Sequence, residues 1–474
     1  MIQHAWTGYQ KYAAPHDELK PVTVGSVDML HGWGATLVES MDTLLLADMV
    51  EEYQAAKMMF LDRLKQHQWN RADDIGESDV DGDSKEQAAV ENDSISFFNG
   101  VVRYIGGLLS AAELEEVPDP EVLQAAVSLG DRLIHAFQGS KNALPGNRIF
   151  DNGTVGLNEA LFGKVSLAEV CTFQLEFRKL SQLSNDDKYM DLAQENFSYL
   201  SSLKPRIAGL YPAYFDTEAG ASQDYVASFG SLSDGFYEYL LKTFILTGDV
   251  RFRDLYISTI EAMHSHLISR PHKKSEPYLV LGVYDTATES LVPKMDHLSC
   301  SAPGLLALGA RVLGRTKDLV AARGLMETCY LSYKNSVTGL GADEIAFLES
   351  EYLKGRDFEM PQPSGFYVID PEYNLQPETV ESLFILYRIT GDEKYQDYAW
   401  EIAQAIERNC RTKAGYSTLA NVMDASEGMT DRMPSHFLAQ TLKYLYLIFS
   451  SPDLASLDDF IFSTGGHLMK YPIA

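Results

Sequence analysis

The sequence predicts an all-α protein in which pairs of helices pack side by side into a closed ring. Apolar residues recur at helical spacing through most of the chain, one helix–turn–helix pattern appears three times, and no clear polar repeat caps either end. A hairpin of two helices cannot bury its apolar face alone, so it must stack on neighbours in an open solenoid or a closed toroid. The missing caps favour the toroid.

The repeated pattern has a tight turn between its two helices. The first copy carries an apolar stripe over 175–183, the turn Ser-Asn-Asp, and a second stripe over 189–193. The other copies run over 239–256 and 383–399, each with the turn Thr-Gly-Asp. We expect the Asn or Gly to end the first helix in a left-handed conformation and the Asp to cap the second helix.

The chain is predicted to be one domain over residues 1–474, because no linker divides it. The segment 67–96 is rich in Asp and Glu and is expected to form an acidic surface loop. Within it, Asp79-Val-Asp-Gly-Asp83 resembles the start of an EF-hand loop. The EF-hand interpretation fails, because the Gly stands at the fourth position instead of the sixth and no Glu occupies the twelfth.

Composition excludes several classes of partner. The 39 Lys and Arg residues against 67 Asp and Glu give a net charge of −28, which repels nucleic acid and anionic membranes. No apolar run reaches the roughly 18 residues that a membrane-spanning helix needs. We therefore expect neither nucleic acid nor a membrane as a partner.

The compartment and the cysteines leave alternatives open. No signal peptide opens the sequence, so either the chain is not secreted or a leader has been removed. Sequons at Asn92, Asn152 and Asn196 favour the secretory pathway or the extracellular space. The four cysteines show no CxxC spacing, which argues against a zinc site. One disulfide plus two buried thiols fits this count, with the pairing open.

Two carboxyl groups stand where a sugar hydrolase needs them. Such an enzyme uses one carboxyl group to protonate the leaving oxygen and a second to activate water or attack carbon. Asp234 and Glu378 each lie at the expected start of an inner helix, and Glu381 follows one turn after Glu378. The structural alternative is that both acids only stabilise helix N-termini.

Five motifs carry a family resemblance. They resemble signatures of class I α-mannosidases, glycoside hydrolase family 47, and occur in that family's order over nearly the whole chain. The motifs are Gly32-Trp-Gly-Ala-Thr-Leu-Val-Glu-Ser-Met-Asp-Thr-Leu, Arg103-Tyr-Ile-Gly-Gly-Leu-Leu-Ser-Ala, Met295-Asp-His-Leu, Pro377-Glu-Thr-Val-Glu-Ser and Phe437-Leu-Ala-Gln-Thr-Leu-Lys-Tyr-Leu-Tyr.

The resemblance implies an (αα)7 barrel that removes α-1,2-linked mannose with inversion and with calcium. We accordingly expect a monomer that binds an oligosaccharide or another small molecule in the barrel pocket. The resemblance also implies a disulfide between Cys300 and Cys329. By motif, Glu378 falls on the general base and Asp234 on a second catalytic carboxylate. The remaining matches are a pocket arginine, a sugar-contacting histidine and a calcium-binding threonine, here Arg103, His297 and Thr464.

The sugar-facing positions depart from the family pattern. An amide, Asn99, stands where the family has its acid Glu, and an amide cannot donate a proton as a general acid. Two arginines of the family, two glutamates and one phenylalanine are also replaced, here by Leu232 and Gln376, by Gln440 and Gly465, and by His436. The lost carboxylates at 440 and 465 weaken the expectation of calcium.

Three functions follow from this mixture. The first is an α-mannosidase-type hydrolase with altered specificity or slow turnover, in which Asp234 or His436 replaces the missing acid. The second is a glycan-binding protein without hydrolysis. The third is a barrel recruited to acid–base chemistry on a non-sugar metabolite.

Overall fold

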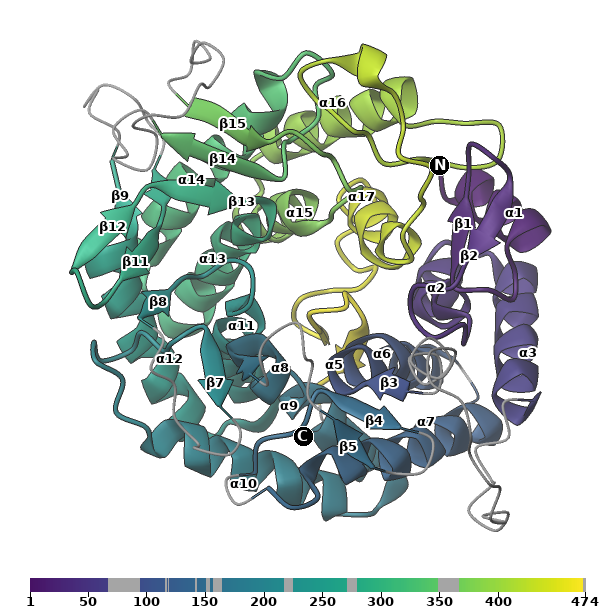
Figure 1. The fold of residues 1–474 in the computed structure, drawn as a ribbon, viewed down its shortest axis with the longest axis horizontal. Coiled ribbons are helices and arrows are strands. Elements are labelled where there is room, and N and C mark those ends of the chain that lie inside the picture. The colour runs from purple at the N-terminus through teal and green to yellow at the C-terminus, as the bar shows by residue number, and fades with distance from the viewer. Residues whose placement is uncertain are drawn as a thin grey trace, which may run out of the picture.

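Helices form two concentric rings around a central axis in the computed structural model (Figure 1). The structure describes all residues except 67–93, 116, 118, 141–142, 151–153, 157–163, 217–224, 271–278, 348–365 and 472–474. The ring is closed, because α2 (Ala35–Leu46) packs against the π-helical turn Phe437–Thr441 that leads into α17 (Leu442–Leu447). The predicted toroid is confirmed.

Inner and outer helices alternate along the chain. The inner ring consists of α2, α6 (Gly106–Leu114), α9 (Gln174–Ser184), α11 (Asp234–Thr247), α13 (Ala302–Leu313), α15 (Glu378–Thr390) and α17. The outer ring consists of α1 (Ile2–Tyr12), α3 (Val50–Gln66), α7 (Pro120–Leu133), α10 (Lys188–Ser202), α12 (Val250–Ala262), α14 (Thr316–Lys334) and α16 (Lys394–Asn409). Short helices α5 (Phe97–Asn99) and α8 (Leu167–Cys171) precede α6 and α9. Seven helical pairs make this an (αα)7 barrel.

The three predicted helical pairs are α9–α10, α11–α12 and α15–α16. Asp249 caps α12 as expected, since its side chain accepts the N–H of Arg251. In the third pair the cap residue of α16 is Glu393, one position after the expected Asp392. The first helix of each pair ends in a left-handed residue, namely Asn185 (φ 55°), Gly248 (φ 71°) and Gly391 (φ 67°).

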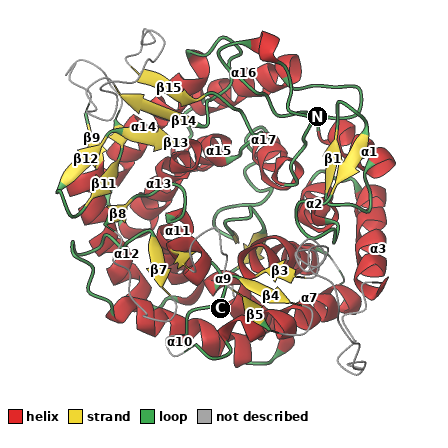
Figure 2. Ribbon diagram, in the orientation of Figure 1, coloured by secondary structure: helices red, strands yellow, loops and turns green. Residues whose placement is uncertain are grey.

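Short strands join the helix ends in small antiparallel sheets, which the sequence did not predict (Figure 2). Strands this short offer too few alternating residues for a periodic signal. The sheets pair β1 (Glu18–Lys20) with β2 (Gly25–Val27); β3 (Ser94–Ser96), β4 (Arg148–Phe150) and β5 (Val155–Gly156); β6 (Lys164–Ser166) with β7 (Tyr214–Asp216); β8 (Val226–Ala227), β11 (Val283–Asp285) and β12 (Ser290–Val292); β9 (Ile268–Ser269) with β10 (Val280–Leu281); β13 (Lys294–Asp296), β14 (Glu344–Phe347) and β15 (Phe366–Asp370); and β16 (Phe460–Phe462) with β17 (Leu468–Lys470).

The C-terminal hairpin β16–β17 enters the middle of the ring (Figure 1). Lys443 of α17 donates to the carbonyl of Gly466 at 2.6 Å, and Lys179 of α9 donates to the carbonyl of Lys470 at 2.6 Å. The hydroxyl of Ser110 in α6 accepts the N–H of Leu468. Because these bonds come from helices around the ring, the hairpin forms the floor of the barrel.

A buried ion cluster fastens this floor to the inner ring. The carboxylate of Asp42 in α2 lies 2.7 Å from the Lys443 ammonium and 3.1 Å from His467 Nδ1, and all three side chains are fully buried. Burial alone would raise the pKa of Asp42, but Lys443 and His467 outweigh it and lower the pKa to about 2. The three groups therefore depend on one another for charge compensation.

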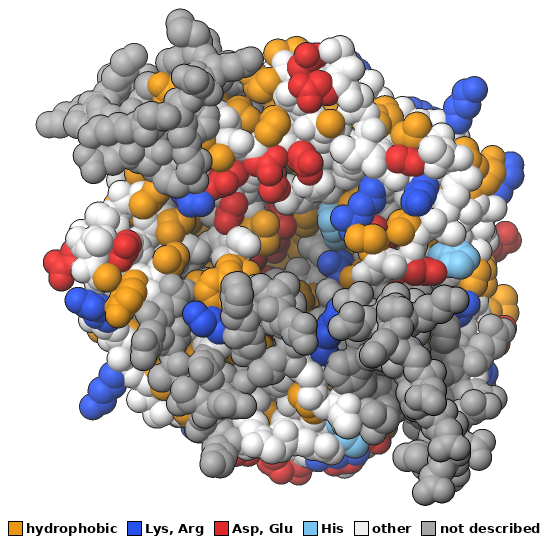
Figure 3. Space-filling view, in the orientation of Figure 1, with side chains coloured by type: hydrophobic (Ala, Val, Ile, Leu, Met, Phe, Trp, Pro, Cys, Tyr) orange, Lys and Arg blue, Asp and Glu red, His pale blue; other side chains and the backbone are white. Residues whose placement is uncertain are grey.

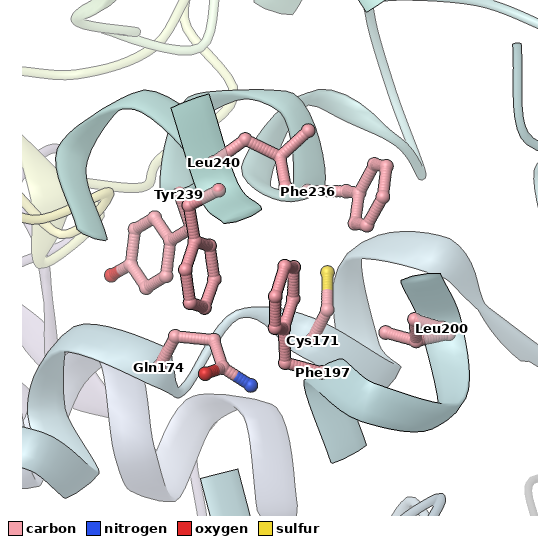
Figure 4. Close-up of a pocket in the computed structure, with 8 residues that line it drawn as sticks. Cys171, Gln174, Phe197, Leu200, Phe236, Tyr239 and Leu240 are labelled. Carbon is pink, nitrogen blue, oxygen red and sulfur yellow. The ribbon is translucent and has the colours of Figure 1, made fainter. Parts of the chain in front are cut away.

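Aromatic side chains fill the layer between the two rings. Phe197 of α10 stacks on Phe252 of α12 with ring centroids 3.5 Å apart. A cavity of about 10 Å³ remains in this layer, which is room for at most one water molecule (Figure 4). Its lining is mainly apolar, formed by Cys171, Gln174, Phe197, Leu200, Phe236, Tyr239, Leu240 and Phe252. This is a packing gap and not a ligand site.

The cysteines pair as the family resemblance implied. Cys300 and Cys329 form a disulfide between the start of the α13 region and α14, while Cys171 and Cys410 are buried free thiols. The bridge closes a loop over a sequence separation of 29 residues. Replacing both Cys300 and Cys329 by Ala is expected to destabilise the fold by about 3–4 kcal/mol. Thermal unfolding checks this, with Cys171→Ala as the control that removes a buried thiol but no cross-link; equal effects would contradict the prediction.

Three sequence expectations concern the surface. The sequon residue Asn196 is fully buried, with its amide nitrogen donating to the carbonyls of Ala143 and Val170, so glycosylation cannot occur there in the folded chain. Asn92, Asn152 and most of the acidic loop lie outside the described residues. No helix in the described part of the chain is long and apolar enough to cross a membrane.

Candidate active site

A hollow opens at the centre of the face shown in Figure 3, with acidic side chains on its upper left border and basic and histidine side chains on its right. The predicted site residues come from the starts of inner helices, from the turns before them and from the floor hairpin. The inner helices therefore deliver residues that are far apart in sequence to one end of the barrel axis.

Asp234 is the first residue of α11, as the sequence predicted. Burial raises the pKa of Asp234 well above its ordinary value, and the negative charges of Glu238, Asp296 and Glu378 raise it further. A carboxyl group in this setting retains its proton at pH values where an exposed Asp is ionised. Asp234 is therefore able to donate a proton.

Glu378 is the first residue of α15 and is held by a histidine. Its Oε2 lies 2.8 Å from Nδ1 of His297, whose Nε2 lies 2.7 Å from the hydroxyl of Tyr333. His297 is almost completely buried, so its ring position is fixed on both sides. The structure thus brings together Asp234, Glu378 and His297, which the sequence placed in one site.

Arg103 and Asn99 face each other across one helical turn. The Arg103 Nε donates to the side-chain oxygen of Asn99 at 3.0 Å, and its Nη1 lies 2.9 Å from the fully buried carboxylate of Glu39. The same Nη1 also donates to Ser435. Asn99 consequently orients Arg103 but has no proton to transfer.

His436 lies close enough to Arg103 and to Glu378 for the charges of both to act on its imidazole. Burial and the Arg103 guanidinium lower the pKa of His436, while the carbonyl of Asn374 and the charge of Glu378 partly oppose this. Its Nε2 lies 3.0 Å from that carbonyl, a contact in which Nε2 carries the proton and donates it. His436 is therefore a neutral imidazole whose Nδ1 can accept a hydrogen bond.

Gln376 and Leu232 occupy the turns before the two candidate acids. Gln376 Nε2 donates to Asp343 at 2.8 Å, and its Oε1 is buried without a hydrogen-bond partner among the described residues. Burial raises the pKa of Asp343, which the Gln376 bond partly offsets. Leu232 has the left-handed φ of 76° two residues before Asp234.

The floor beneath the site contains Thr464, the expected calcium ligand. Its N–H donates to the hydroxyl oxygen of Tyr239 at 3.2 Å, and that hydroxyl donates to Glu176 at 2.6 Å. Gln440 lies against Gly466: a Cβ added to Gly466 would be 2.8 Å from the Cγ of Gln440. A Cβ on Gly465 would be 2.8 Å from the Val102 carbonyl oxygen, so the backbone leaves no room for a side chain there.

Thr464 is the residue that the family resemblance assigns to calcium. The described residues contain no group of three or more His, Cys, Asp or Glu that could hold a metal. The other oxygen of Glu176, Oε2, is buried and has no hydrogen-bond partner among the described residues. Because burial raises the pKa of Glu176 to about 8, this carboxyl group would ionise near neutral pH only when a nearby cation lowers that pKa.

Comparison with known proteins identifies the family. The sequence model for glycosyl hydrolase family 47 matches residues 1–471. The chain belongs to glycosyl hydrolase family 47. The family signatures found in the sequence are therefore genuine, and the closed helical barrel agrees with them.

Relatives of this family 47 chain include 1,2-α-mannosidases. It is 36% identical over 470 residues to the endoplasmic reticulum mannosyl-oligosaccharide 1,2-alpha-mannosidase of Homo sapiens, covering 98% of this chain but 62% of that protein. A mannosyl-oligosaccharide 1,2-alpha-mannosidase of Arabidopsis thaliana is 35% identical, with 98% and 77% covered. The alpha-1,2-mannosidase from Trichoderma reesei superposes with a TM-score of 0.85 at 29% identity, covering 99% and 97% of the two chains. The chain thus spans about three fifths of the human relative.

Sequence reasoning missed Lys242 and Glu238 of this family 47 site and named Glu381 without its partners. Lys242 is paired with Glu238 and lies 3.8 Å from Glu381. Burial raises the pKa of Glu381 to about 8, with Lys242 opposing and Glu238 and Glu378 adding to the shift. The signal available was weak: Glu381 lies inside the Pro377 motif, and Glu238 and Lys242 follow Asp234 at helical spacing.

Glu176 makes stability depend on pH in a direction that can be measured. Burial raises the pKa of Glu176 from 4.5 to about 8, so the folded chain keeps a proton that the unfolded chain releases. Stability is therefore expected to fall as pH rises from about 4.5 to 8, by at most roughly 1.4 kcal/mol per pH unit. Melting temperatures in EDTA between pH 5 and 8 check this. Glu176→Gln should flatten the dependence, whereas Glu121→Gln at the surface should not; an unchanged slope in Glu176→Gln would contradict it.

Proposed function

We propose that the chain hydrolyses α-1,2-linked mannose in oligosaccharides with inversion, using Glu378 as general base and Asp234 as general acid. The observation that carries the proposal is the pairing of a proton-retaining Asp234 with Glu378: each is the first residue of an inner helix, and the charge of Glu378 helps to raise the pKa of Asp234. Inverting glycosidases need these two carboxyl roles on opposite sides of the scissile bond.

The reaction follows from the two roles. Glu378 takes a proton from water while the water oxygen bonds to the anomeric carbon. The bond from that carbon to the leaving oxygen breaks, and Asp234 gives its proton to that oxygen. His297 keeps the Glu378 carboxylate in place through its 2.8 Å contact. Exchange with solvent then restores both carboxyl groups.

Asp234 is the better acid in this proposal than His436. Burial raises the pKa of Asp234 but lowers that of His436, so the histidine lacks a second proton to donate at neutral pH. His436 is assigned instead to accept a hydrogen bond from a sugar hydroxyl through Nδ1. Arg103, whose side chain is 21% exposed, is assigned to bind sugar oxygen atoms.

Calcium is part of the same proposal. Thr464 would hold the ion, whose positive charge would lower the raised pKa values of Glu176 and Glu381, so that their ionised carboxylates offset it across water. When bound, the ion supplies positive charge that holds sugar hydroxyls at the floor. We also propose that the chain works in the secretory pathway, because the human relative is named for the endoplasmic reticulum.

A second candidate function is glycan binding without hydrolysis. The observation that favours it is the amide of Asn99, which holds Arg103 at 3.0 Å in a position where the family motif carries an acid. In that case the hollow binds mannose but transfers no proton. The two functions differ only in turnover, so one set of measurements separates them.

The deciding experiment is mannose release from an α-1,2-linked mannose oligosaccharide, with calcium and again with EDTA. Release of β-mannose as the first anomer, lost in Glu378→Gln and Asp234→Asn, supports the inverting hydrolase. Binding of the oligosaccharide without release moves the assignment to glycan binding. If the folded chain neither binds nor cleaves the oligosaccharide, both candidate functions are overturned. Chemistry on a non-sugar metabolite then remains. If EDTA abolishes mannose release and lowers the melting temperature, the proposed calcium site is supported. If EDTA changes neither the release nor the melting temperature, the calcium proposal is overturned.

A further inference from the structure

Three exposed aromatic side chains form a patch on the surface of the barrel. Trp400 of the outer helix α16 is 56% exposed, while Phe449 and Tyr446, at the end of α17, are 45% and 37% exposed. The rings of Trp400 and Phe449 are nearly perpendicular, with centroids 5.8 Å apart. The N–H of Phe449 donates to the carbonyl of Tyr446, so the two side chains leave one helical turn on the same side. These three residues are the aromatic patch.

Core packing does not account for the exposure of Trp400. α16 packs on the barrel through another face, which includes Tyr395 and Ile402. The indole belongs to neither hydrophobic cluster of the described residues. Trp6 and Trp33, the other tryptophans that the structure describes, are both buried. Contiguous exposed apolar side chains of this kind mark interaction sites, whereas single ones need no explanation.

The aromatic patch is held in place at the end of the barrel away from the candidate acids. Gln396 of α16 donates to the carbonyl of Ile448 at 2.8 Å, which ties α16 to the turn that carries the exposed phenylalanine. Arg388, in the last turn of α15, donates to the carbonyl of Leu447 at 2.9 Å. Because α15 begins with Glu378 and Arg388 lies near its other end, the aromatic patch is separate from the hollow.

The surroundings of the aromatic patch favour a neutral sugar ring as its ligand. Asp397 and Gln404 are both exposed, and they lie one turn before and one turn after Trp400 on the same side of α16. An indole can pack against the C–H face of a hexose while a carboxylate and an amide beside it bond to the hydroxyl groups at the edge of the ring. The carboxylates of Asp397 and Glu401, with the net charge of −28, disfavour an anionic ligand or a second copy of this chain.

The size of the aromatic patch agrees with a sugar and not with a stable protein interface. Three aromatic side chains that are about half exposed offer on the order of 300 Å². A stable protein–protein interface takes roughly 800 Å² from each partner. One or two hexose rings need no more surface than the aromatic patch provides.

We propose that the aromatic patch is a second carbohydrate site, which binds one or two neutral hexose residues of an oligosaccharide through stacking on Trp400. Asp397 and Gln404 bond to hydroxyl groups of the same sugar. The site goes beyond the proposed function, because it requires no hydrolysis and lies away from Asp234 and Glu378. A glycan bound there would hold the chain on a glycan-bearing surface while the hollow remains open to another branch.

Electrophoresis in native gels that contain α-1,6-linked mannan tests the site. This polysaccharide is neutral and lacks the α-1,2 linkage that the hollow is proposed to cleave. We expect the native chain to be retarded, and Trp400→Ala to raise the apparent dissociation constant roughly 10-fold, whereas Trp400→Phe should keep most of the retardation. Met58→Ala is the matched control with unchanged retardation, because Met58 is 60% exposed on another outer helix, α3. Polygalacturonate, which is anionic, should not retard the native chain.

A second measurement reports on the aromatic patch without removing it. In the chain labelled with 5-fluorotryptophan, the fluorine resonance of Trp400 is the one that is absent in Trp400→Phe. We expect this resonance to shift when α-1,6-linked mannotriose is added. Trp400→Ala should melt within about 2 °C of the native chain, because substitutions at exposed positions change stability little.

Several results would overturn the inference. They are no retardation of the native chain by mannan, equal retardation of Trp400→Ala, equal retardation by polygalacturonate, and an unshifted Trp400 resonance. A dimer in sedimentation that Trp400→Ala dissociates would also overturn it, since a second copy would then cover the aromatic patch. None of these results bears on mannose release from an α-1,2-linked oligosaccharide, and absence of that release would leave this site untouched, so the two failures are distinguishable.

Discussion

Asn99→Glu is expected to raise the rate of mannose release by roughly 10²-fold, the lower end of a general acid's usual contribution, because Asp234 already supplies a proton in the native chain. The new carboxyl group would stand next to Arg103, which already bonds to the side-chain oxygen at this position. Initial rates on an α-1,2-linked mannose oligosaccharide measure the gain.

Asn99→Gln is the matched control for this substitution. Glutamine has the size of glutamate but no proton to donate, so its rate should remain near that of the native chain. The pH profile adds a second criterion: because burial raises the pKa of Asp234, native activity should fall as pH rises through that raised value. Equal rates in Asn99→Glu and Asn99→Gln would show that the site lacks more than an acid.

Lys443→Met is expected to destabilise the chain by about 3–5 kcal/mol, because it leaves the buried Asp42 carboxylate without its main counter-ion. The ammonium also bonds to the carbonyl of Gly466 at 2.6 Å, so the floor hairpin loses a contact as well. The melting temperature and the rate of thermal inactivation measure the loss.

A double substitution separates charge from packing in this cluster. Asp42→Asn together with Lys443→Met removes both charges, and its cost should be smaller than the sum of the two single costs. Lys65→Met serves as the surface control, because Lys65 pairs with Glu121 where both side chains are about two-thirds exposed. Additive costs in the double variant would contradict the mutual charge compensation of Asp42 and Lys443.

Local sequence signals were sufficient to predict the helical pairs. The left-handed caps at Asn185, Gly248 and Gly391 and the Asp cap of α12 depend on residues next to one another, so they can be read without tertiary contacts. The shift of the α16 cap to Glu393 shows the limit of such reading. Tertiary packing can shift the end of a helix by one residue, and the sequence pattern alone does not contain that information.

The family motifs predicted more of the site than residue spacing did, because they assigned roles to residues that spacing only marked as candidates. Asp234 and Glu378 were placed at helix starts, and the structure confirms those positions. Their roles remain a proposal. Two partners of the site residues were not predictable, because Tyr333 and Asp343 lie outside all five motifs; Glu39 lies in the first motif, but its contact with Arg103 appears only in the folded chain.

The sequence by itself determined the paired helices, the closed ring, the cysteine bridge implied by the family and the positions of the candidate acids. The tertiary structure alone decided which carboxyl groups are buried together, how Asp42 and Lys443 hold the floor, and that Trp400 is exposed beside Phe449. The physical reason is distance along the chain. Caps and apolar stripes act over a few residues, whereas desolvation, charge pairing and ring contacts depend on neighbours that only the closed barrel brings into contact.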